Sequence, residues 1–259
     1  MIIESDRVIK TISPTMLSAW IRCRADWYNR YISKTDRNGT WNMQVGNAIH
    51  LATYLYHSKT GNWEEGIREF WEDHDKILSH PNAPSLETAV TLMRVYILKN
   101  PRHPGDTAEQ YFKINIKGLD NPLTGIFDLL PGDGHGIVEF KTGGWWTQSR
   151  VDMAMQTIHY TLAYRELYGR MPDYFHYYAF EFDNMRVKHI KTHVTEEELD
   201  EFVSYVKSVT DEMKNGVIIP KCLFKDNKQE CWYPDECQAI MNEVRSKSIK
   251  VARVKDENV

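Results

Sequence analysis

Three charged residues, Asp128, Glu139 and Lys141, lie in two apolar segments joined by a glycine-rich turn. The two segments predict paired strands of a hairpin. Because residues two apart in a strand point the same way, Glu139 and Lys141 share a face, and Asp128 can meet them from the other strand. Charged side chains are rarely buried without a partner or a metal ion. The stretch 123–141 therefore predicts either a divalent-metal site or a cross-strand salt bridge on a solvated face.

The metal-site interpretation implies a specific chemistry. Two carboxylates that converge on one point repel each other unless a cation lies between them. Mg²⁺ and Mn²⁺ prefer such oxygen ligands and keep waters for a substrate phosphate and a nucleophile. A lysine beside the carboxylates can orient or deprotonate the attacking water, or stabilise charge in the transition state. This interpretation predicts metal-assisted hydrolysis of phosphodiester bonds in nucleic acid.

Predicted helices and strands surround this hairpin and must position it. Apolar spacing and capping signals predict helices over 13–32, 42–57, 62–79, 85–100, 151–168 and 195–215. Alternating patterns predict strands over 109–116, 174–182 and 186–194. This order of elements predicts an α/β fold with a mixed central β-sheet flanked by helices.

Further residues occur before and after the hairpin in a fixed order. The sequence contains Gly46-x-x-x-His50, Gly125-x-x-Asp128, Glu139-x-Lys141 and Gln156-x-x-x-Tyr160. This series resembles the RecB-like branch of the PD-(D/E)xK nuclease superfamily, from residue 13 to about residue 164. Phe127 stands where the superfamily pattern has a proline, which RecB-like members often lack.

The resemblance implies a restriction-endonuclease-like core and assigns a role to each motif residue. Metal would be bound by His50, Asp128 and Glu139, together with the backbone carbonyl of Phe140. Lys141 would be the catalytic lysine. The implied catalytic set is completed by two residues that position the substrate or the site, Gln156 and Tyr160. The implied metal is Mg²⁺ or Mn²⁺, since imidazole beside carboxylates suits both.

The four cysteines form a second pattern, with Cys23 far upstream of Cys222, Cys231 and Cys237. This arrangement resembles the iron–sulfur staple of AddB-type and CRISPR-associated exonucleases and implies a [4Fe–4S] cluster. The gap of eight residues between Cys222 and Cys231 is longer than the two residues typical of that family. Structural zinc and free thiols are the alternatives.

Length and patterning suggest a single RecB-like nuclease domain over 1–241, with a helical insert at about 60–104 and the cysteine segment 222–237. A charged tail over 242–259 is expected to be disordered. The sequence contains no apolar run of eighteen residues and no signal peptide, so we expect a cytoplasmic protein of a bacterial or phage-infected cell, without membrane contact. The net charge of −4 neither predicts nor excludes nucleic-acid binding.

The expected function is a metal-dependent DNA exonuclease acting in recombination, repair or phage DNA processing. Its expected partners are single-stranded DNA or ended duplex, with a helicase or a single-strand annealing protein as further candidates. A structure-specific endonuclease of the same superfamily is one alternative. A nuclease-derived module that binds DNA or a partner without cutting is the other. The sequence does not indicate the oligomeric state.

Overall fold

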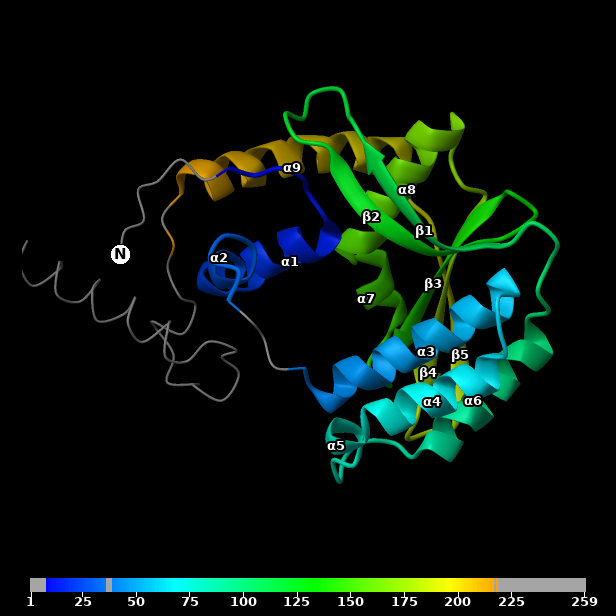
Figure 1. The fold of residues 1–259 in the computed structure, drawn as a ribbon. Coiled ribbons are helices and arrows are strands. Elements are labelled where there is room, and N and C mark those ends of the chain that lie inside the picture. The colour runs from blue at the N-terminus through cyan, green and yellow to red at the C-terminus, as the bar shows by residue number, and fades with distance from the viewer. Residues whose placement is uncertain (1–7, 36–38, 217, 219–259) are drawn as a thin grey trace, which may run out of the picture. The chain divides into compact units, whose positions relative to one another are not determined.

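The computed structural model describes residues 8–35, 39–216 and 218, and the chain forms two compact units (Figure 1). One unit comprises 1–37, 117–122 and 203–259, and the other comprises 38–116 and 123–202. The second unit contains every residue predicted to take part in hydrolysis. The predicted single-domain organisation stays a prediction. The predicted tail and three of the four cysteines lie outside the described residues.

A mixed sheet forms the centre of the second unit. Its order is β1-β2-β3-β4-β5, where β1 is Thr107–Ile114, β2 is Leu123–Leu130, β3 is Gly136–Thr142, β4 is Tyr174–Glu181 and β5 is Arg186–Thr192. Neighbouring strands are antiparallel except β3 and β4, which are parallel. A parallel pair needs a crossover, and the helices between β3 and β4 supply it. The sheet and its helices confirm the predicted α/β fold and the β2–β3 hairpin.

Helices cover both faces of this sheet (Figure 1). Of the described helices, four belong to one side of the sheet: α3 (Trp41–Ser58), α4 (Trp63–Asp73), α5 (Asp75–Leu78) and α6 (Leu86–Lys99). They bury a common apolar cluster with Leu129, Val138, Phe140 and Phe180 of the sheet. The crossover consists of α7 (Gln148–Asp152) and α8 (Met155–Tyr168). On this side Tyr160 of α8 packs edge-on against Phe112 and Phe127.

The first unit contains α1 (Pro14–Arg22) and α2 (Arg24–Tyr31), and α9 (Glu196–Asn215) runs through parts of both units. The single helix predicted over 13–32 is wrong in one respect. Cys23 is extended, with φ −163° and ψ 114°, and separates α1 from α2. The helix predicted over 151–168 is likewise interrupted, between α7 and α8. The helix predicted over 195–215 is confirmed, and a capping box opens it, because Thr195 and Glu198 exchange backbone-to-side-chain hydrogen bonds.

Within the described part of the chain, none of the helices combines the length and apolar character needed to cross a membrane.

Candidate active site

Asp128 lies where the β2–β3 pairing is interrupted. The two strands share only one registered pair, Leu129 with Val138. Beyond it, the backbone N–H of Phe140 donates to Asp128 Oδ2 at 2.8 Å. A side-chain carboxylate thus accepts a hydrogen bond that a strand carbonyl would accept in a regular ladder. The arrangement fixes one oxygen of a buried carboxylate and leaves Oδ1 for another ligand.

His50 approaches Asp128 from α3. Its Nδ1 lies 3.5 Å from Asp128 Oδ1 and 3.4 Å from Glu109 Oε1. Gly46, one turn earlier on α3, lies near the end of β3, where a Cβ would make an ordinary van der Waals contact of 3.6 Å with Thr142 Oγ1. Burial alone would lower the pKa of His50, but Asp128, Glu109 and Glu139 outweigh it and raise that pKa to about 9. The imidazole is therefore placed in a field that favours a cation.

Glu109 belongs to the site although the sequence did not single it out. In the β1–β2 register it falls opposite Asp128, between the pairs Ala108–Leu129 and Gln110–Phe127. Its φ of +52° is in the left-handed region, which is uncommon for a glutamate in a strand. One ligand atom each of His50, Glu109 and Asp128 lies within 4.8 Å of the others. A glutamate at this position does not indicate a left-handed backbone, so only the structure shows that Glu109 lies at the site.

Glu139 and Lys141 lie on one face of β3, as the strand period predicts, and Gln156 of α8 meets them there. Lys141 Nζ donates to Glu139 Oε1 at 2.5 Å and to Gln156 Oε1 at 2.8 Å. Gln156 Nε2 donates to the same Glu139 oxygen at 2.6 Å. The lysine ammonium is thus held by two acceptors on two elements, which fixes its position next to the carboxylates.

The salt-bridge alternative required a solvated face, and Glu139 does not lie on one. Its side chain is 1% exposed, and Oε2 has no hydrogen-bond partner among the described residues. Burial and the nearby Asp128 carboxylate raise the pKa of Glu139 to about 8, although Lys141 opposes the shift. An unpartnered buried carboxylate oxygen is costly unless it binds a proton or a cation. This oxygen fits a divalent-metal ligand.

Tyr160 occupies a packing position behind these polar groups. Gly125 makes room for it, because a Cβ at residue 125 would lie 2.8 Å from Tyr160 Cε1 and 2.6 Å from Phe112 Cζ. Tyr160 is 6% exposed, and burial raises the pKa of its hydroxyl well above the usual range. Its predicted part in substrate positioning stays a prediction, as does the metal-ligand role of the Phe140 carbonyl.

A buried polar network braces the opposite side of β3. His57 Nδ1 lies 2.7 Å from Asp106 Oδ2, and His57 Nε2 lies 2.8 Å from the Tyr96 hydroxyl. The His57 ring stacks on Phe140 with ring centroids 6.3 Å apart. Burial lowers the pKa of His57 even though Asp106 opposes the shift. The neutral imidazole thus joins α3, α6 and the start of β1 behind the strand that carries Glu139 and Lys141.

The predicted cluster ligand Cys23 is half-buried at the α1–α2 junction. Cys222, Cys231 and Cys237 lie outside the described residues. The iron–sulfur assignment therefore stays a prediction.

The fold is a mixed sheet with helices on both faces, and carboxylates, a histidine and a lysine converge on it. The chain belongs to the PD-(D/E)XK nuclease superfamily, whose family profile matches residues 11–238. This match confirms the superfamily that the ordered motifs indicated. Nucleases of this superfamily use divalent metals, and the donor set described above fits one.

One solved structure has the same fold at low sequence identity, and a second shows a weaker similarity. A protein from Eubacterium rectale, described as a candidate exonuclease, is 15% identical with a TM-score of 0.60, over 89% of this chain and 88% of that one. An alkaline exonuclease from Laribacter hongkongensis is 13% identical with a TM-score of 0.34, over 81% of this chain and 98% of that one. None of the curated proteins matches the sequence.

Proposed function

We propose that this protein is a metal-dependent DNA exonuclease. The observation that carries the proposal is the convergence of His50, Glu109 and Asp128 next to the buried, unpartnered oxygen of Glu139. Membership of a nuclease superfamily supports phosphodiester hydrolysis. The description of the Eubacterium rectale protein, which has the same fold, as a candidate exonuclease is consistent with cleavage from strand ends.

We assign metal binding to His50, Asp128, Glu139 and the Phe140 carbonyl, with Glu109 as an additional carboxylate. When bound, Mg²⁺ or Mn²⁺ supplies Lewis-acid stabilisation of phosphate charge and lowers the pKa of a bound water. His50 must be neutral to act as a ligand. Because its pKa is raised to about 9 without metal, metal binding near neutral pH releases a proton.

Lys141 is the residue assigned to the attacking water and to charge on the phosphate. Glu139 and Gln156 hold its ammonium through bonds of 2.5 and 2.8 Å, so it needs little reorganisation during the reaction. Gln156 donates to Glu139 as well, and therefore joins the metal-binding part of the site to the lysine. We assign Gln156 a positioning role.

The test is cleavage of linear and circular DNA, each single- and double-stranded, with Mg²⁺ or Mn²⁺. We expect linear DNA to be shortened from its ends and circular DNA to stay intact. Lys141→Ala should reduce the rate by roughly 10²–10³-fold, a typical cost of losing one stabilising group. Lys113→Ala is the matched control, since Lys113 is an exposed lysine on β1.

Three results would contradict parts of the proposal. Cutting of circular DNA would indicate an endonuclease. Wild-type protein that binds DNA but is as inert as Lys141→Ala with both metals would indicate a non-cleaving binding module. Preferential hydrolysis of RNA would reassign the substrate. Assays with a helicase or an annealing protein added then test the proposed partners through a change in rate.

We also propose a [4Fe–4S] cluster bound by Cys23, Cys222, Cys231 and Cys237, supported by the number and order of these cysteines. Anaerobic purification should yield a brown protein, and Cys231→Ala should be colourless. A colourless wild-type protein that carries zinc would refute the cluster.

A further inference from the structure

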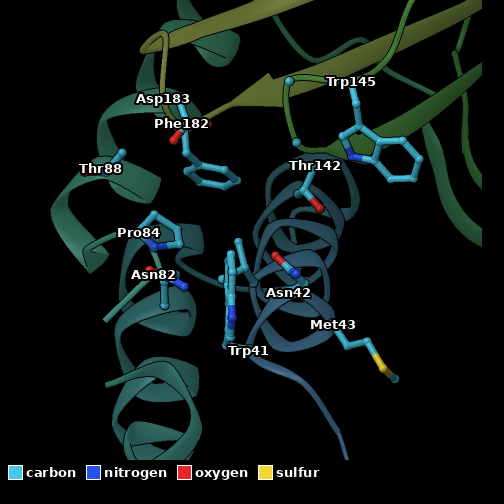
Figure 2. Close-up of a pocket in the computed structure, with 14 residues that line it drawn as sticks. Trp41, Asn42, Met43, Asn82, Pro84, Thr88, Thr142, Trp145, Phe182 and Asp183 are labelled. Carbon is cyan, nitrogen blue, oxygen red and sulfur yellow. The ribbon is translucent and has the colours of Figure 1, made fainter. Parts of the chain in front are cut away.

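A pocket of about 610 Å³ opens at the end of β3, at the residues that directly follow Lys141. It lies between the first turn of α3, the segment before α6, the exit of β3 and the β4–β5 turn (Figure 2). Its volume is within the range of about 300–1,000 Å³ that is usual for ligand pockets. Thr142, which follows Lys141 directly, lines the pocket and is the side chain that α3 approaches at Gly46. The pocket therefore adjoins the end of the strand that carries the catalytic lysine.

Flat apolar surfaces and polar groups alternate around this pocket. Figure 2 shows the Trp41 indole standing between Asn42 and Asn82, with the Phe182 ring above it. Trp41 is half-buried and stacks on His80, with ring centroids 5.8 Å apart. This contact supports the indole from one side, as is required of a platform on which a planar ligand stacks.

A second indole is fixed on the other side of the pocket. Trp145 packs on Gly143, whose missing Cβ would lie 2.5 Å from the indole Nε1, and the φ of Gly143 is +100°. The Arg150 guanidinium lies 3.9 Å from the Trp145 ring centroid. Trp145 is nevertheless 55% exposed. A large aromatic ring that is held in place yet open to solvent is suited to binding a ligand.

The polar groups of the pocket are available to a ligand. The side chains of Asn42, Asn82 and Asp183 make no hydrogen bond to other described residues. They offer amide donors, amide acceptors and one carboxylate acceptor. None of the fourteen lining residues is a lysine, arginine or histidine, and Asp183 is the only charged one. This composition disfavours a phosphate and favours a neutral, planar ligand that has hydrogen-bonding edges.

We propose that this pocket holds an unpaired nucleobase of the substrate strand while a neighbouring phosphodiester lies at the metal site. The inference rests on the proposed nuclease function and narrows its substrate to single-stranded DNA or a frayed end. A base within a duplex has its edge paired and both faces stacked, so it cannot meet these groups. An apolar peptide would leave the two asparagines and Asp183 without partners.

The test compares two short labelled strands of equal length and charge, one with normal bases and one built from abasic residues. Binding is measured by fluorescence anisotropy with Ca²⁺, and gel analysis checks that the strands remain intact. We expect the strand with bases to bind roughly ten-fold more tightly, as one stacked base would produce. Trp41→Ala should abolish most of this preference without changing the affinity for the abasic strand, and Trp41→Phe should retain it.

Trp63→Ala is the matched control, because Trp63 is also half-buried against the same apolar cluster but does not line the pocket. It should leave the preference intact. The proposal is wrong if the wild type binds the two strands equally well, or if Trp41→Ala weakens the binding of both strands equally. It is also wrong if Trp63→Ala has the same effect as Trp41→Ala. Circular dichroism shows whether each variant is folded.

A measurement on the wild type covers the case in which Trp41→Ala does not fold. A strand carrying 5-iodouracil is irradiated on the protein, and mass spectrometry locates the cross-link. Attachment at Trp41 or Trp145 supports the pocket, and attachment only elsewhere overturns it. Base preference without cleavage would refute the nuclease function alone, and cleavage without base preference would refute the pocket alone. Failure to bind either strand would refute both.

Discussion

The left-handed backbone of Glu109 allows a direct test of whether this residue is held in place for the site. A residue with a Cβ pays about 1–2 kcal/mol in this conformation, and glycine does not. Glycine gains entropy in the unfolded chain relative to alanine, which offsets about 0.4–1 kcal/mol of that difference. At φ +52° we therefore expect Glu109→Gly to be more stable than Glu109→Ala by about 1 kcal/mol.

The comparison of glycine with alanine isolates the backbone, because both variants remove the carboxylate. Lys113 is the control on the same strand, at an exposed position outside the positive-φ residues. There the order should be reversed, with glycine less stable than alanine by roughly 0.5–1 kcal/mol. The assay is urea unfolding of metal-free protein, followed by fluorescence and circular dichroism.

The same variants separate stability from metal binding. Glu109→Gly and Glu109→Ala should both bind Mn²⁺ more weakly than the wild type, whatever their stability, since both lack the third carboxylate of the site. If Glu109→Gly were less stable than Glu109→Ala, the backbone would not be strained. If Mn²⁺ affinity were unchanged in both, Glu109 would not be a ligand.

Three further predictions concern other parts of the site. Gly125→Ala places a Cβ 2.6 Å from Phe112 and should cost about 1–3 kcal/mol in urea unfolding, with partial recovery in the double variant with Phe112→Leu. Gln156→Ala should slow cleavage more than it weakens Mn²⁺ binding, as kinetics and metal titration would show, because Gln156 holds Lys141. The pKa of His50 is raised from 6.5 to about 9, so its contribution to stability is present below pH 6.5 and lost as the pH rises through 9. Metal-free wild type should therefore lose more stability over this pH range than His50→Gln, and equal slopes would contradict the assignment.

Much of the site could be predicted from the order of the motifs in the sequence and from the two-residue period of a strand. Glu139 and Lys141 share a face because β3 is regular, and His50 Nδ1 lies 3.5 Å from Asp128 Oδ1. Their assigned roles stay predictions. The sequence did not predict that Glu109 belongs to the site, because a glutamate in an alternating segment does not indicate a left-handed backbone.

The predictions of helix boundaries were wrong for a different reason. Apolar spacing continues in phase across Cys23 and across 153–154, so periodicity predicted uninterrupted helices where the chain is extended or turned. Local hydrogen bonds decide such breaks. Within the crossover, the Thr157 hydroxyl donates to the Val151 carbonyl at 2.8 Å and joins the two helices across their junction.

The hydrogen bond from the Phe140 N–H to Asp128 also bears on how the family diverges. A descendant of this chain that stopped cutting would still need an acceptor at residue 128 to satisfy a buried backbone N–H. Retention of aspartate there would then reflect folding as much as catalysis. Asparagine could keep the acceptor without the charge. Among homologues, residues 109 and 141 should therefore distinguish active from inactive members better than residue 128 does.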